Sequence, residues 1–115
     1  MLIRSQDKRM IANFDNICTV SAFPEKDSED IYVEDGTGSL MVGRYSAKAK
    51  AMKVLDMIQE AYAEYKITCT FLTGFTGHRA IVESNDVQVN GFGELVKSFK
   101  KNMVFQMPED SEVEA

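Results

Sequence analysis

The chain has 115 residues, of which 44% are hydrophobic, so it can fold as one domain and is too apolar to be a disordered chain. No apolar run reaches the roughly 18 residues of a membrane-spanning helix, and the charged N-terminus lacks the apolar core of a signal peptide. With two cysteines and a formal net charge of −5, the sequence predicts a reduced, cytoplasmic protein that does not enter a membrane.

The N-terminal quarter of the chain contains short runs of residues that favour β-strands. Residues 2–6 alternate weakly and predict a first strand. Residues 10–23 are also rich in strand formers, but the turn pair Asp15-Asn16 interrupts them. They therefore predict either one bent strand or two short strands around a turn, followed by a polar, acidic loop over residues 25–30.

A hairpin is predicted next in the chain. Residues 31–33 and 40–42 are short apolar runs on either side of Asp35-Gly36-Thr37-Gly38. Glycine supplies the positive φ that a tight turn needs, which makes Asp-Gly between two apolar runs a strong hairpin signal. The strands of this half of the chain are therefore expected to form an antiparallel β-meander of three or four strands.

Residues 46–66 have the clearest periodicity in the chain and predict an amphipathic helix, with Ser46 as its N-cap. At about 100° per residue, one face of this helix carries eight apolar or aromatic side chains. They are Ala47, Ala51, Val54, Leu55, Ile58, Ala61, Tyr62 and Tyr65. Because such a face has to be buried, the predicted fold class is α+β, with the β-meander packed on this one long amphipathic helix.

The second half of the chain has weaker patterns. The elements expected there are a strand over residues 67–72, a small hairpin over residues 79–89, a short C-terminal helix over residues 94–101 and a last strand over residues 103–107. We predict a single α+β domain over residues 1–107, in which residues 67–102 form a variable insert. An acidic, disordered tail is predicted over residues 108–115.

The acidic residues are clustered, and these clusters are the main candidates for a functional surface. Residues 25–35 contain six acids and one lysine, residues 109–114 contain four acids and no base, and the rest of the chain is mildly basic. A third group, three acids at intervals of four, forms a column on the predicted helix. Either these clusters bind a partner or they only keep the chain soluble. The candidate partner-binding residues are Glu25, Asp27, Glu29, Asp30, Asp56, Glu60, Glu64, Glu109 and Asp110.

No catalytic, metal or cofactor site is predicted. Cys69 and His78 are the residue types of a nucleophile and its base, but no third residue that would orient them is evident. The acidic loop at residues 27–30 lacks the spacing and the glycine of a calcium-binding loop. The basic residues have no interleaved aromatic residues, so direct binding of nucleic acid is not predicted either.

Three stretches of the chain carry a family resemblance: IRSQDK at residues 3–8, YS at residues 45–46 followed by KVLDMIQ at residues 53–59, and FQMPED at residues 105–110. In these stretches the chain resembles a set of small, mostly uncharacterised proteins of Gram-positive bacteria, their phages and their mobile elements. The resemblance covers residues 1–66 and 103–112. It implies a cytoplasmic accessory protein of phage or mobile-element type, and it carries no assigned active site.

The sequence leaves three functions open. The first is a non-enzymatic module that binds a protein partner, either a host factor or a second copy in a homodimer. The second is an anti-CRISPR-like inhibitor of a host defence nuclease, whose acidic segments would occupy a nucleic-acid channel. The third is a small enzyme that uses Cys69 or His78.

Overall fold

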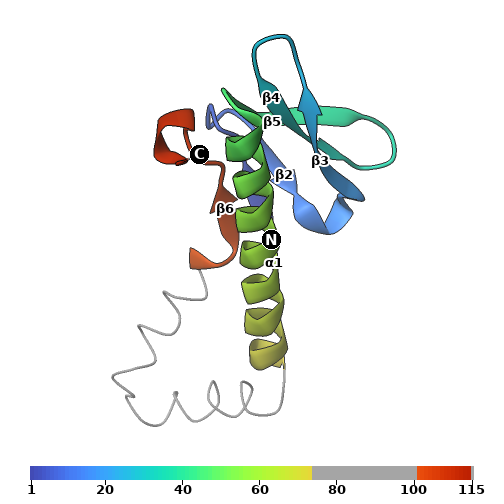
Figure 1. Ribbon diagram of the computed structural model, residues 1–115. Helices are drawn as coiled ribbons and strands as arrows, with labels where there is room; N and C mark the ends of the chain where they lie inside the picture. The colour runs from blue at the N-terminus through green and yellow to red at the C-terminus, as the bar shows by residue number, and fades with distance from the viewer. Residues whose placement is uncertain (74–100, 115) are drawn as a thin grey trace.

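Figure 1 shows the computed structural model, which describes residues 1–73 and 101–114. In this part of the chain two small β-sheets pack with one long helix, so the predicted α+β fold class is confirmed. The strands are β1 (Leu2–Arg4), β2 (Ile11–Asn13), β3 (Thr19–Pro24), β4 (Glu29–Glu34), β5 (Ser39–Tyr45) and β6 (Val104–Gln106). The helices are α1 (Lys48–Thr73) and two short 3-10 turns, η1 (Phe14–Asn16) and η2 (Asp110–Glu112).

The larger sheet is an antiparallel β-meander with the strand order β3-β4-β5. The turn between β4 and β5 is the predicted hairpin, in which Gly36 has a φ of +93°. The carboxylate of Asp35 accepts hydrogen bonds from the backbone N–H groups of Thr37 at 2.9 Å and Gly38 at 3.1 Å. The side chain of Asp35 therefore closes the turn in which glycine provides the required backbone conformation.

The smaller sheet differs from the single meander that the sequence predicts. Its order is β2-β1-β6, with β1 antiparallel to β2 and parallel to β6. The turn expected at Asp15-Asn16 lies in η1, which separates β2 from β3 and sends the two strands into different sheets. The parallel pairing aligns Ile3 with Phe105, from opposite ends of the chain. Local sequence patterns do not reveal such a pairing, because parallel strands are joined by a long connection.

The apolar face predicted for the helix is confirmed. Ala51, Val54 and Ile58 of α1 are buried, and the partly buried residues that pack against the core include Leu55, Ala61, Tyr62 and Tyr65. The core lies between this face of α1 and the inner faces of the sheets, as the arrangement in Figure 1 indicates. Its largest fully buried apolar or aromatic side chains are Tyr45, Ile3, Ile31, Met107 and Val54.

The helix continues past its predicted end, so the prediction of a strand over residues 67–72 is wrong. α1 runs to Thr73. The hydroxyl groups of Thr68 and Thr70 donate to the carbonyl groups of Glu64 and Lys66, at 2.9 and 2.8 Å, which satisfies these polar side chains within the helix. The β-branched residues that favour a strand lower the helix propensity of this segment only slightly, and a long helix tolerates this small free-energy cost. The hairpin and short helix predicted over residues 79–89 and 94–101 fall outside the described residues, apart from residue 101.

Replacing Gly43 with alanine is expected to lower the free energy of unfolding by about 1–2 kcal/mol through overpacking. A Cβ atom at this position would lie 2.9 Å from Cε2 and 3.2 Å from the hydroxyl oxygen of Tyr45, and 3.0 Å from Cε of Met107. The ring of Tyr45 is buried and hydrogen-bonded, so it cannot move aside easily. Urea unfolding followed by circular dichroism measures the change. Gly38→Ala is the matched control, because nothing lies within 4 Å of its Cβ position; equal losses in both variants would contradict the prediction.

Candidate interaction surfaces

The nine acidic residues predicted to bind a partner lie on different elements. Four are in or next to the turn between β3 and β4, three are on α1, and two are in the tail. Asp30 is buried, and Glu29 and Asp110 are half-buried. The exposed residues are Glu25, Asp27, Asp56, Glu60, Glu64 and Glu109. The structure therefore brings these residues together as three groups and not as one acidic surface.

Of these nine residues, Asp30 differs most from the prediction, which places it in a polar loop. It lies in β4 with 0% exposure, and its carboxylate accepts hydrogen bonds from Nε and Nη2 of Arg44, both at 3.1 Å, and from the hydroxyl of Ser28 at 2.9 Å. The hydrogen-bonded Arg44 guanidinium lowers the pKa of Asp30, against the opposing effect of burial. A fully buried carboxylate cannot contact a partner directly, so Asp30 leaves the set of candidate surface residues.

The tail is ordered over residues 108–114, which corrects the prediction of a disordered segment. Met107 and Val113 are both buried in the core cluster. At the intervening turn η2 the backbone N–H of Glu109 donates to the carboxylate of Glu112 at 3.0 Å, and the backbone N–H of Glu112 donates to the carbonyl of Glu109 at 3.0 Å. Two apolar anchors and a capped turn thus hold a segment whose acidic composition is typical of disorder.

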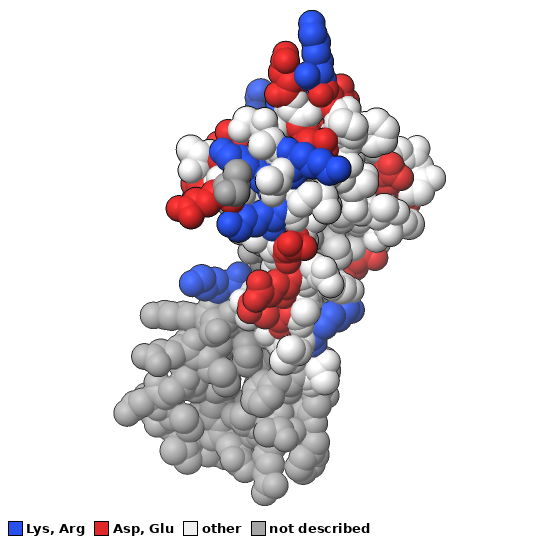
Figure 2. Space-filling view, viewed as in Figure 1, with Lys and Arg blue, Asp and Glu red and all other residues white. Residues whose placement is uncertain are grey.

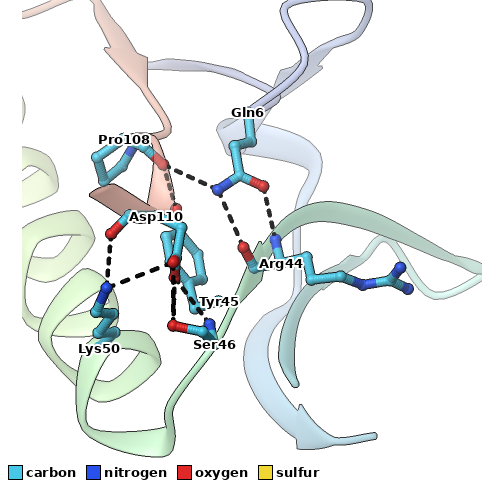
Figure 3. A network of polar contacts seen from close by, with 7 residues as sticks. All are labelled: Gln6, Arg44, Tyr45, Ser46, Lys50, Pro108 and Asp110. Atoms are coloured by element: carbon cyan, nitrogen blue, oxygen red, sulfur yellow. Dashed lines mark hydrogen bonds and ion pairs between the residues drawn. The ribbon is translucent and has the colours of Figure 1, made fainter. Parts of the chain in front are cut away.

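Asp110 fastens this tail to the start of α1 (Figure 3). Its carboxylate accepts hydrogen bonds from the backbone N–H of Ser46 at 2.8 Å and from the Ser46 hydroxyl at 3.0 and 3.1 Å. The ammonium of Lys50 donates to the Asp110 carbonyl at 2.9 Å and to its carboxylate at 3.4 Å. These bonds, chiefly that from the Ser46 N–H, lower the pKa of Asp110. The predicted N-cap role of Ser46 is wrong. The N-cap is the residue whose carbonyl accepts the first hydrogen bond of the helix, and here the carbonyl of Ala47 accepts it from the backbone N–H of Ala51 at 3.2 Å.

Gln6 covers the outer edge of β5 in the same network (Figure 3). Its side-chain amide accepts a hydrogen bond from the backbone N–H of Arg44 at 2.9 Å and donates to the carbonyl groups of Arg44 and Pro108 at 3.1 and 3.2 Å. Its backbone N–H donates to the carbonyl of Val42 at 2.8 Å. The hydroxyl of Tyr45 also donates to Pro108, at 2.8 Å. This network joins the segment after β1, strand β5 and the tail, so its role is to hold the fold together.

The charges along α1 change sign from its start to its middle. In Figure 2 acidic side chains gather over α1, below a group of basic ones. The predicted acidic column is exposed at Asp56, Glu60 and Glu64, whereas Lys53 donates to the carbonyl of Glu114 at 2.9 Å. Like charges four residues apart repel each other by a few tenths of a kcal/mol. The column is therefore a solvated face that a basic partner could contact, and the basic residues near the helix start hold the tail.

The face of the larger sheet that points away from α1 is open to solvent within the described part of the chain. Cross-strand pairing places Phe23 of β3, Tyr32 of β4, and Met41 and Arg44 of β5 on this face. Met41 and Arg44 share it although they are three residues apart, because the pairing of β4 with β5 shifts register between Ile31 and Tyr32. We call these four residues the outer-face cluster. Phe23 is 60% exposed, Met41 is 38% exposed, and the side chain of Arg44 is 63% exposed. A hollow of about 270 Å³ beside them is lined by Ser21, Phe23, Glu25, Tyr32, Glu34 and Ser39.

The sequence reasoning missed this cluster because it searched for charge and not for alternation across the meander. Phe23 is the residue before the last of a strand in which Thr19 and Ser21 share its face, and Met41 lies in a short apolar run. A period-two count over β3, β4 and β5 puts Phe23, Tyr32 and Met41 on the same side of the sheet. That count is the signal that would have found them.

The residues of the predicted enzyme alternative are only partly described. Cys69 lies half-buried on α1, and a hydrogen bond with it raises the pKa of Tyr65. His78 falls outside the described residues, so a nucleophile and base formed by these two residues stays a prediction. Over residues 1–73 and 101–114, no three His, Cys, Asp or Glu side chains converge as metal ligands. In the same ranges no helix combines the length and the apolar character that crossing a membrane requires.

The chain was compared with known protein families, with curated proteins and with solved structures. No family model matches it. No curated protein and no solved structure matches it either. The geometry and chemistry of the surfaces described above are therefore the basis for inferring a function.

Proposed function

We propose that this chain is a non-enzymatic protein-interaction module of phage or mobile-element type, which binds a protein partner through the outer-face cluster. The observation that carries the proposal is the exposure of Phe23, Met41 and Arg44 on a sheet face that no described element covers. Aromatic residues, methionine and arginine are enriched in protein interfaces relative to the rest of the surface. Aromatic and arginine side chains also carry most of the binding free energy where it has been measured.

The position of Arg44 supports this proposal further. Its Nε and Nη2 atoms are both bonded to the buried carboxylate of Asp30, which fixes the plane of the guanidinium. A side chain that is already fixed loses little conformational entropy when a partner binds. The remaining donors of Arg44 therefore suit a carbonyl or carboxylate of the partner, beside an apolar side chain that contacts Phe23 and Met41.

The two alternatives gain less support. An anti-CRISPR-like inhibitor would use the acidic segments to imitate phosphates, but Asp30 and Asp110 are engaged by Arg44 and Lys50 within the chain. Their charges are largely balanced where they lie, which favours a partner on the sheet face. The enzyme alternative uses Cys69 or His78; His78 is outside the described residues, and the described geometry around Cys69 adds nothing in its favour.

Met41→Lys is expected to weaken partner binding at least about tenfold, which is about 1.4 kcal/mol. The lysine would place a charge in the apolar part of the contact, where desolvating it is unfavourable. Wild type and variant are compared as tagged baits in a lysate of a Gram-positive bacterium, and the affinity for the retained protein is then measured with purified components. Met41 is already 38% exposed on the sheet face, so the fold should tolerate the change.

Met52→Lys is the matched control, because Met52 is 46% exposed on α1, away from the outer face of the sheet. Retention of one protein by wild type and by Met52→Lys, with its loss in Met41→Lys, supports the proposal. Equal binding by both variants counts against the outer-face cluster. A chain that retains no protein but hydrolyses a substrate in an activity screen would overturn the non-enzymatic function itself.

A further inference from the structure

The larger sheet has two edges, and the described part of the chain covers only one of them. Gln6 covers β5 with both its backbone and its side chain. On the other side, within the described residues, β3 pairs with β4 alone. The described contacts include no hydrogen bond to the outer backbone groups of residues 19–23. Such an edge offers unpaired N–H and C=O groups to another strand.

The sequence of β3 lacks the features that usually protect an exposed edge. Natural edge strands in monomers tend to carry a lysine or another charge, an internal proline, or a bulge. Residues 19–23 contain no charged side chain, and Pro24 comes only at the last position of the strand. Phe23, near that end, is 60% exposed. The sequence of β3 therefore allows its exposed edge to pair with another strand.

The strand is also complementary to itself. If two copies align antiparallel with Ser21 opposite Ser21 of the second copy, Thr19 lies opposite Phe23 and Val20 lies opposite Ala22. A β-branched residue opposite an aromatic one is a favourable cross-strand pair. Val20 and Ala22 both pack against the core, so their pairing extends the apolar inner face of the sheet. Within residues 19–23 no like charges oppose each other, because none of these side chains is charged.

We propose that this chain forms a homodimer in which the β3 strands of two copies pair antiparallel around Ser21, so that the two meanders become one continuous sheet. The dimer uses the backbone edge of β3, whereas the proposed protein partner uses the sheet face, so the two proposals can fail separately. Pairing also places the outer-face clusters of both copies on one continuous surface. The partner of the module then faces a twofold-symmetric site.

Ser21→Lys tests the pairing through the oligomeric state of the full chain. A lysine at the centre of the edge would oppose a lysine of the second copy and is a known guard against strand pairing. Light scattering after size exclusion is expected to give twice the mass of one chain for wild type, and the mass of one chain for the variant. Gln59→Lys, which adds the same charge on an exposed position of α1, is expected to remain dimeric. A wild type that stays monomeric up to millimolar concentration would refute the dimer.

The register is tested with single cysteines in a chain that carries Cys18→Ser and Cys69→Ala. Ser21→Cys is expected to form an intermolecular disulfide on mild oxidation, because directly opposed residues in antiparallel strands have Cα atoms about 4.5–5.5 Å apart. Ala22→Cys should not, since residue 22 lies opposite residue 20 of the second copy. A disulfide in Ala22→Cys but not in Ser21→Cys, or equal yields from both, would overturn the proposed pairing. Circular dichroism confirms that each variant is folded before the comparison.

Discussion

A chain that ends at Gln106 is expected to lose about 5 kcal/mol of its free energy of unfolding, which is comparable with the whole stability of a small domain. The truncation removes the buried side chains of Met107 and Val113, each of which contributes roughly 1.5–3 kcal/mol by its burial. It also takes away the carbonyl acceptor of the Tyr45 hydroxyl and the carboxylate that binds Ser46. Urea unfolding followed by far-ultraviolet circular dichroism measures the loss.

A chain that ends at Glu114 is the control for this truncation, because it keeps every tail contact that the structure describes, including the carbonyl of Glu114 that accepts from Lys53. Its unfolding midpoint should equal that of the full chain. Asp110→Asn gives a finer measure, since it leaves the buried side chains in place and weakens only the charged contacts with Ser46 and Lys50. A truncation at Gln106 as stable as the full chain would show that the tail adds nothing to stability and would restore the prediction of a disordered acidic tail.

The parts of the fold that could be predicted from the sequence are those with a local physical cause. The face of α1 follows from apolar residues at helical spacing, and Val54 and Ile58 are buried as predicted. The hairpin follows from Gly36, whose positive φ few other residues adopt. The strand over residues 67–72 is predicted from β-branched and aromatic residues, and such a weak preference does not decide between a new strand and the continuation of a long helix.

The parts that could not be predicted depend on contacts between distant residues. Val113 is an isolated apolar residue in an acidic segment, and only the folded core shows that it is buried. Asp110 is held by Ser46, 64 positions earlier in the chain. The candidate site has the same difficulty. The sequence shows Asp30 as one acid among several in a loop. The structure instead pairs Asp30 of β4 with Arg44 of the neighbouring strand β5, and this pairing fixes Arg44, a residue of the outer-face cluster.

Arg44→Gln is expected to lower the free energy of unfolding at neutral pH, by less than the loss of a fully buried partner would. Removing one partner of a buried ion pair typically costs about 3–5 kcal/mol, because the other charge stays buried without compensation. The Arg44 side chain is 63% exposed, which reduces the effect, since solvent screens that end of the pair. The measurement is urea unfolding of wild type and variant at a series of pH values, and Arg9→Gln, at an exposed loop position, is the control.

The pH dependence separates a charge effect from a loss of packing. Arg44 lowers the pKa of Asp30 below its ordinary value of 3.8, so the pair stabilises the fold above that pH. This stabilisation is lost as the pH falls through the lowered pKa, because the carboxylate is then protonated in both states. The difference between wild type and Arg44→Gln should therefore be largest at neutral pH and shrink below about pH 4. Replacing both residues, as Asp30→Asn with Arg44→Gln, should be less harmful at neutral pH than Arg44→Gln alone, because no charge is left buried. A loss that is constant with pH, and no recovery in the double variant, would mean that Arg44 acts through its packing and that Asp30 does not hold it in place for a partner.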